Sequence, residues 1–175
     1  MRYRLVVYAM LALLIAVPAA AQQSKADLFA GYSYLRFDSA SLGLPHTSNL
    51  NGWAATGTVY FKRWLGGVAD FSGNYGKNYG FAFNTYSFLG GPELAYRRHG
   101  NNIFIRGLVG AARNSVSGET ATALEYGGGA GLDIGLRSHL VVRAFQADYL
   151  KVRTFGVYQK NVRVSTGLVW RLGKK

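Results

Sequence analysis

Three histidines are the residues of this chain best suited to proton transfer, and none is positioned for catalysis. A serine hydrolase needs a histidine within reach of a serine, with an acid that orients the imidazole. His99 and His139 fall in short polar breaks, and neither lies on a strand beside an outward-facing serine. His46 has Ser41 and Asp38 nearby, but it lies in a polar stretch that is better interpreted as a solvated loop. The sequence therefore predicts no enzyme.

Metal and nucleotide chemistry find equally little support. The chain has no cysteine, so disulfides and thiolate metal sites are excluded. Asp38 and Glu119 are too few for a calcium site, and no His, Asp or Glu spacing is typical of metal ligands. The glycines of 127–131 resemble a dinucleotide-binding motif, but they alternate within an extended segment and do not open a helix. We expect no cofactor and no metal.

Four charged residues could instead do electrostatic chemistry inside an enclosed space. Glu93 and Arg106 are equidistant from the centre of one polar break, and Asp133 and Arg143 from the centre of another. If each break is a tight antiparallel turn, Glu93 faces Arg106 and Asp133 faces Arg143. An unpaired buried charge is costly, so such side chains must pair or meet water. We interpret the two pairs as a polar plug, with a gate for small solutes as the alternative.

The segments that carry these residues alternate between apolar and polar or small residues with a period of two. We count eight of them, at 27–37, 52–61, 67–75, 85–96, 102–112, 124–136, 140–150 and 162–172. Alternation over about ten residues is typical of transmembrane β-strands, with short turns on one side and longer loops on the other. In 124–136 large apolar residues alternate with glycine and acidic residues. We expect the apolar face to meet lipid and the small, acidic face to line the interior.

The seventh segment contains a conflict of parity. Arg143 has the opposite parity to Gln146 and Asp148, so a regular strand cannot point all three inward. Either a β-bulge lies between Arg143 and Gln146, or some of the three face outward. Gln146 and Asp148 would lie towards the outer rim, where exposure of polar groups costs less.

The amino terminus has the pattern of an export signal. Arg2 and Arg4 precede an apolar run that is too short to span a membrane, and three consecutive alanines follow it. We expect residues 1–21 to be a cleaved signal peptide and residues 22–175 to form one domain. Charged residues make up only 16% of the chain, against about 25% in ordinary soluble domains, which suits a surface in lipid.

The last segment and three short motifs carry a resemblance to a known family. Gly167, Trp170 and Leu172 resemble the β-signal by which the outer-membrane assembly machinery recognises a final strand, although the signal usually ends in Phe. The other motifs are Gly31-Tyr32-Ser33-Tyr34, Gly90-Gly91-Pro92 and Gly129-Ala130-Gly131-Leu132-Asp133. With them the chain resembles the small outer-membrane β-barrel domain family, the OmpA/OmpX-type barrels. The resemblance implies an all-β, eight-stranded, antiparallel up-and-down transmembrane barrel in the outer membrane of a diderm bacterium. It also implies a structural or surface-interaction role without catalysis.

Basic residues at the outer ends of the segments are candidates for contact with lipopolysaccharide phosphates. They are Arg36, Lys77, Arg113, Lys151, Arg153 and Lys160. A merely solvated rim is the alternative. Export, and the lack of any Lys/Arg cluster on a helix, argue against a nucleic-acid partner despite a formal charge of +12. We expect outer-membrane lipid and the assembly machinery as partners, and a monomer.

Three other functions remain open at this point. A narrow passive pore would use the same fold with a conducting lumen. A soluble periplasmic barrel of lipocalin type, binding an apolar ligand, would need apolar residues inside, the reverse of 124–136. A lipid A-modifying enzyme would share the barrel, but the positions of the histidines argue against it.

Overall fold

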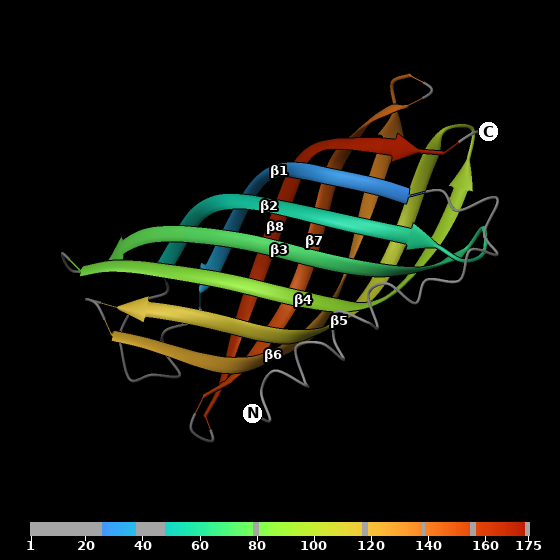
Figure 1. The fold of residues 1–175 in the computed structure, drawn as a ribbon. Coiled ribbons are helices and arrows are strands. Elements are labelled where there is room, and N and C mark those ends of the chain that lie inside the picture. The colour runs from blue at the N-terminus through green and yellow to red at the C-terminus, as the bar shows by residue number, and fades with distance from the viewer. Residues whose placement is uncertain are drawn as a thin grey trace, which may run out of the picture.

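The computed structural model describes residues 26–37, 48–78, 81–116, 119–137, 139–154 and 157–173, all of them in strands or tight turns. The strands are β1 (Ala26–Phe37), β2 (Ser48–Tyr60), β3 (Leu65–Asn78), β4 (Phe81–Arg98), β5 (Asn101–Val116), β6 (Glu119–Gly135), β7 (Leu140–Thr154) and β8 (Val157–Leu172). Each strand pairs antiparallel with the next, and β8 pairs with β1, so the sheet closes into one barrel (Figure 1). All eight predicted strands are confirmed. The predicted signal peptide lies outside the described residues.

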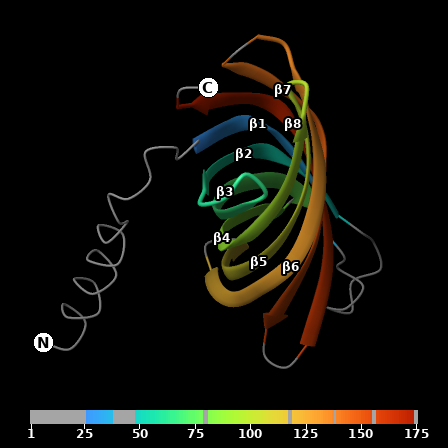
Figure 2. The ribbon, with the colours of Figure 1, turned by 90° about the vertical axis from the view of Figure 1, so that its right-hand side faces the viewer.

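The two mouths of the barrel differ in what they contain. The end of β8 lies beside the start of β1 (Figure 2), and the β2–β3, β4–β5 and β6–β7 connections are at the same mouth, which we call the terminal mouth. The β4–β5 connection is only His99 and Gly100, with φ of 49° and 87°. Positive φ at both central residues is the requirement of a type I′ hairpin turn. We call the opposite end the distal mouth; the longer connections predict that it is the outer one.

The strands extend further towards the distal mouth than predicted. The stretches 76–84, 113–120 and 151–161 fall between the predicted segments and were therefore expected to be loops, but most of their residues belong to β3–β8. The prediction was wrong because it followed hydropathy alternation. Beyond the apolar band the outward residues, such as Lys151, Arg153 and Lys160, are polar themselves, so hydropathy stops alternating although burial still does, and the backbone hydrogen bonds of the ladder continue.

Side chains divide cleanly between the outside and the lumen. Large apolar residues such as Phe88, Ile105 and Trp170 are 62%, 55% and 55% exposed on the outer surface, whereas Asp70 and Arg163 are 0% and 1% exposed inside. An exterior this apolar is the reverse of the surface of a soluble barrel, and the lumen holds its charges together with small apolar clusters, one of them formed by Phe29, Ala54, Val141 and Val169. Among the described residues, no helix is long and apolar enough to cross a membrane.

A β-bulge resolves the conflict of parity in β7. The register of β7 against β8 shifts between Arg143 and Gln146. Ala144 and Phe145 are consecutive and both exposed, so the bulge absorbs one residue. Arg143, Gln146 and Asp148 are consequently all buried in the lumen. The prediction of a bulge is confirmed, and the alternative that Gln146 or Asp148 faces outward is wrong.

Candidate functional site

Two aspartates and two arginines form a network across the middle of the lumen, which we call the central network. Arg106 Nη2 lies 3.0 Å from Asp70 Oδ2 and 2.9 Å from Asp148 Oδ2. Arg163 Nη1 lies 2.8 Å from Asp70 Oδ1, and its Nη2 lies 3.0 Å from Asp148 Oδ2. All four side chains are at most 1% exposed, and their formal charges cancel.

The register of the sheet explains half of this arrangement. Arg106 on β5 lies opposite Gly129 on β6, which lies opposite Asp148 on β7, which lies opposite Arg163 on β8. The four positions therefore form one row across four strands. Gly129 is required there because a Cβ atom would lie 2.0 Å from Asp148 Oδ1. The missing side chain lets Arg106 and Asp148 meet over β6.

Asp70 completes the network from the other side of the barrel. It lies on β3, which neighbours neither β5 nor β8. Thr56 Oγ1 donates a hydrogen bond of 2.9 Å to Asp70 Oδ2, and Arg163 Nη1 donates one of 2.7 Å to Ser72 Oγ. The contact from Arg163 to Asp70 thus spans the lumen and links β8 to β3.

A second ion pair lies nearer the terminal mouth and connects to the first. Arg143 Nε donates to Asp133 Oδ1 at 2.7 Å, and Arg143 Nη1 donates to Gln146 Oε1 at 2.6 Å. Gln146 Nε2 then donates to Asp148 Oδ2 at 2.8 Å. The ring centres of Phe29 and Phe104 lie 4.5 and 4.4 Å from the guanidinium carbon of Arg143. Gln146 therefore joins the Asp133–Arg143 pair to the central network.

The expected ion pair between Glu93 and Arg106 does not form. The two residues are opposite each other on β4 and β5, as the turn position predicts. Arg106 instead extends to Asp70 and Asp148, and the carboxylate of Glu93 accepts a hydrogen bond from the Tyr60 hydroxyl. An arginine is long enough to reach past its direct neighbour, and here it donates two hydrogen bonds to Asp148 and a third to Asp70.

Asp70 and Arg163 were missed from the sequence, and Asp148 was assigned to the rim. A signal existed: Arg163 has the same parity as Ser165 and Gly167, opposite the apolar residues Val162 and Val164. A charge on the small, polar face of a barrel strand is a lumen residue by position.

Further charges close the terminal mouth. Arg97 on β4 donates a hydrogen bond to Asp27 on β1, and Arg171 Nε lies 3.8 Å from the same carboxylate. The Arg97 guanidinium also lies 3.9 Å from the centre of the Tyr60 ring. Because β1 and β4 are not neighbours, the Arg97 side chain bridges the opening.

The residues expected at the outer rim lie at the distal mouth. Arg36, Arg113, Arg153 and Lys160 are exposed, and Lys151 is partly exposed. Lys77 belongs to β3, but its side chain lies outside the described residues. Lys151 and Lys160 are directly opposite each other on β7 and β8.

The three residues of the expected β-signal lie at the β1–β8 seam. Gly167, Trp170 and Leu172 pair with Gly31, Leu28 and Ala26 of β1. The side chains of Trp170 and Leu172 point outward and are 55% and 42% exposed.

The structure places two of the three histidines. His99 and His139 are exposed in turns of the terminal mouth, and His46 lies outside the described residues. In the part of the chain that the structure describes, no cluster of three or more His, Cys, Asp or Glu residues could hold a metal ion.

A closed barrel with an apolar exterior, a charged lumen and eight antiparallel strands has the fold of a small outer-membrane β-barrel. Ail, the attachment invasion locus protein of Yersinia pestis, superimposes with a TM-score of 0.60 at 19% identity, over 84% of this chain and 99% of Ail. Neisserial surface protein A gives 0.62 at 12% identity, over 85% and 97%. The N-terminal barrel domain of Pseudomonas aeruginosa OprF gives 0.50 at 9% identity, over 86% and 100%. No protein-family model matches the chain, and no curated protein is significantly similar to it in sequence.

Proposed function

We propose that this chain is an outer-membrane barrel with a sealed lumen and a structural or surface-interaction role, without catalysis. The observation that carries the proposal is the division of charge between the two faces of the barrel wall. Every carboxylate whose side chain the structure describes is buried in the lumen: Asp27, Asp70, Glu93, Glu125, Asp133 and Asp148. Arg36, Arg113 and Lys160, which are exposed at the distal mouth, consequently have no described carboxylate on their own face.

The charges buried inside the barrel support a sealed lumen. Eight strands leave an interior that side chains can fill, and here the central network crosses it. Separating buried, mutually paired charges is costly, so the network opposes an aqueous path. The narrow pore remains the alternative, with the central network as its gate.

The cations on the outer surface support contact with anions. Lys151 and Lys160 are like charges directly opposite each other, an arrangement that destabilises a strand pair unless an anion lies between them. Phosphate groups of the outer leaflet, such as those of lipopolysaccharide, supply that anion at the membrane surface. The likeness in fold to Ail, a protein named for attachment and invasion, agrees with a role at the cell surface.

The location follows from the same proposal. We propose the outer membrane of a diderm bacterium, reached after removal of residues 1–21 and insertion by the outer-membrane assembly machinery. The export pattern, the fold and the position of Gly167, Trp170 and Leu172 in the closing strand support it. A closed barrel has no free strand edge, which favours a monomer.

Two measurements test the proposal. Purified barrel in planar bilayers should give no discrete conductance steps; stable single-channel steps would favour the pore. Lipopolysaccharide in the bilayer should raise the unfolding temperature of the wild type, and raise that of the double variant Lys151→Gln/Lys160→Gln less. A double variant with two cations lost at the terminal mouth, Lys62→Gln/Arg63→Gln, is the matched control. Equal stabilisation of all three proteins would refute an anion-binding rim.

A further inference from the structure

A groove of 510 Å³ runs along the outer surface of β3–β6 near the distal mouth. Its lining comes from Phe71, Tyr86, Ser87, Phe88, Ala111, Arg113, Ser115, Thr120 and Thr122. The volume falls within the range of about 300–1,000 Å³ that is common for small-molecule sites. Because the groove opens on the outward face, its natural occupant is a molecule of the surrounding membrane.

The register divides the groove into an apolar and a polar end. Phe71, Phe88 and Ala111 form one cross-strand row on β3, β4 and β5. Small Ala111 beside the two rings makes the hollow. Phe71 and Phe88 contact each other edge to face with ring centres 6.3 Å apart, so they form one continuous apolar wall.

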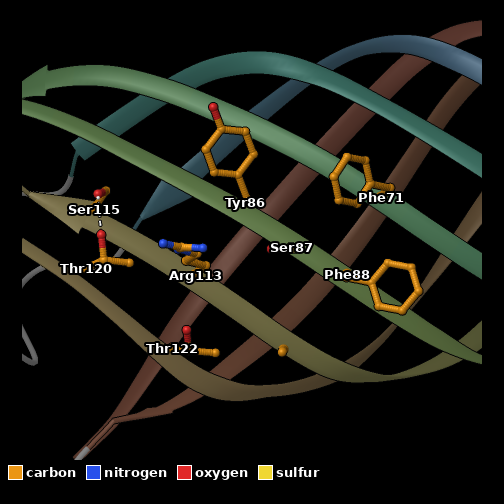
Figure 3. A pocket seen from close by; sticks show the side chains of 9 residues that line it. Phe71, Tyr86, Ser87, Phe88, Arg113, Ser115, Thr120 and Thr122 are labelled. Atoms are coloured by element: carbon orange, nitrogen blue, oxygen red, sulfur yellow. Dashed lines mark hydrogen bonds between the residues drawn. The ribbon is translucent and has the colours of Figure 1, made fainter. Parts of the chain in front are cut away.

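The polar end is nearer the distal mouth. Arg113 lies directly opposite Tyr86 on β4 and Thr122 on β6, and Ser115 lies opposite Thr120 one row further. The hydroxyls of Ser115 and Thr120 are hydrogen-bonded at 3.0 Å. Figure 3 shows the guanidinium of Arg113 and these hydroxyls at one end of the groove and the phenyl rings at the other. From Ala111 to Ser115 the strand advances about 13 Å.

The guanidinium of Arg113 has no anionic partner among the described residues. No hydrogen bond or ion pair joins its side chain to any residue that the structure describes, and all carboxylates described lie inside the lumen. A second copy of this chain would therefore bring no described carboxylate to Arg113. An arginine at the membrane surface binds phosphate strongly, because its planar donors match the phosphate oxygens.

We infer that this groove binds a single phosphate-bearing acyl lipid of the outer leaflet. Arg113 contacts the phosphate, the hydroxyls of Thr120, Thr122 and Ser115 contact the sugar or phosphate oxygens beside it, and one acyl chain lies against Phe71, Phe88 and Ala111. The inference rests on the outer-membrane location in the proposed function and names a discrete site beyond the general attraction of the basic rim.

Native mass spectrometry of the folded barrel with lipid A tests this site. The probes are lipid A with two phosphates and the same lipid after phosphatase treatment. The wild type should retain one phosphorylated lipid, and Arg113→Gln should weaken retention by about tenfold, because one charge-assisted contact is lost. Ala111→Leu should weaken it similarly by filling the hollow without a change of charge. Arg137→Gln, at the terminal mouth, removes the same charge and should bind like the wild type.

Each other outcome overturns the inference. Equal retention of the dephosphorylated lipid would exclude phosphate recognition. Loss with Arg113→Gln but not with Ala111→Leu would leave a surface charge and no groove. Dimers that exclude lipid would assign the groove to a second copy. Heat-modifiable gel migration verifies that each variant is folded, and the conductance measurement is independent of these results, so failure here does not decide whether the lumen is sealed.

Discussion

Asp148→Asn should destabilise the barrel more than any other single carboxylate-to-amide change in the lumen. Asp148 accepts from Arg106 Nε and Nη2 at 3.0 and 2.9 Å, from Arg163 Nε and Nη2 at 3.1 and 3.0 Å, and from Gln146 Nε2 at 2.8 Å. An asparagine oxygen can accept only about two of these bonds and carries no charge. The variant would leave two buried guanidiniums with Asp70 as their only described carboxylate partner.

The expected loss of stability depends on the contacts that the two arginines keep in the variant. Removing one partner of a buried ion pair commonly costs about 3–5 kcal/mol. Asp70 stays within 3.0 Å of both arginines, so we expect the lower end, about 3 kcal/mol. With a urea dependence of about 2 kcal/mol/M, the unfolding midpoint in micelles or bilayers should fall by about 1.5 M.

Glu125→Gln is the matched control for Asp148→Asn. Glu125 is 2% exposed, accepts a hydrogen bond from Ser87 and has no salt bridge to any described residue. Removing a buried charge that forms no ion pair should change the midpoint little or raise it. The double variant Asp148→Asn/Arg163→Gln restores neutrality and should recover part of the loss. If Asp148→Asn costs no more than Glu125→Gln, the central network does not stabilise the fold.

Three further changes test the facing of the strands and the closure of the barrel. Leu132→Arg places a cation on the lipid face of β6 and should cost about 2–4 kcal/mol in bilayer unfolding, whereas Leu132→Met should be neutral; equal stability would mean that Leu132 does not face lipid. Gly167→Ala should reduce the heat-modifiable folded band on gels, because the new Cβ would lie 2.4 Å from a backbone oxygen of β1. Gly57→Ala is the control, since a Cβ there would come no nearer than 3.8 Å to another atom. No difference between the two alanine variants would refute tight closure at the seam. Arg97→Gln leaves buried Asp27 with Arg171, 3.8 Å away, as its remaining ion-pair partner among the described residues, and should lower the free energy of unfolding by about 2 kcal/mol. An unchanged urea midpoint would show that Arg97 does not close the terminal mouth.

Local patterns were enough to predict the strands and one of the lumen pairs. Alternation with a period of two identifies a strand without any knowledge of its partner. Asp133 and Arg143 are joined by a tight turn, so counting outward from that turn gives their pairing. The bulge in β7 was also visible, since three polar residues of mixed parity cannot all face inward without it.

The central network could not be predicted in the same way. Arg163 and Asp70 belong to strands on different sides of the lumen, and their heights match only through the tilt and stagger of the closed barrel. Neither quantity can be read from one strand or one turn. The same limit explains the error at Glu93 and Arg106, where counting from the turn gave the correct neighbour but not the direction of a long side chain.

The expected cost of opening the lumen favours the plug over the gate. A conducting path would have to separate Arg163 from Asp70 and Arg106 from Asp148, at several kcal/mol for each buried pair. Even about 5.5 kcal/mol would keep the open state near one molecule in ten thousand, unless a ligand bound that state preferentially by a comparable free energy. The four charges of the central network are already matched to one another, whereas Arg113 has no partner among the described residues. We therefore expect this barrel to bind ligands on its outer surface, where anionic lipid groups can pair with Arg113.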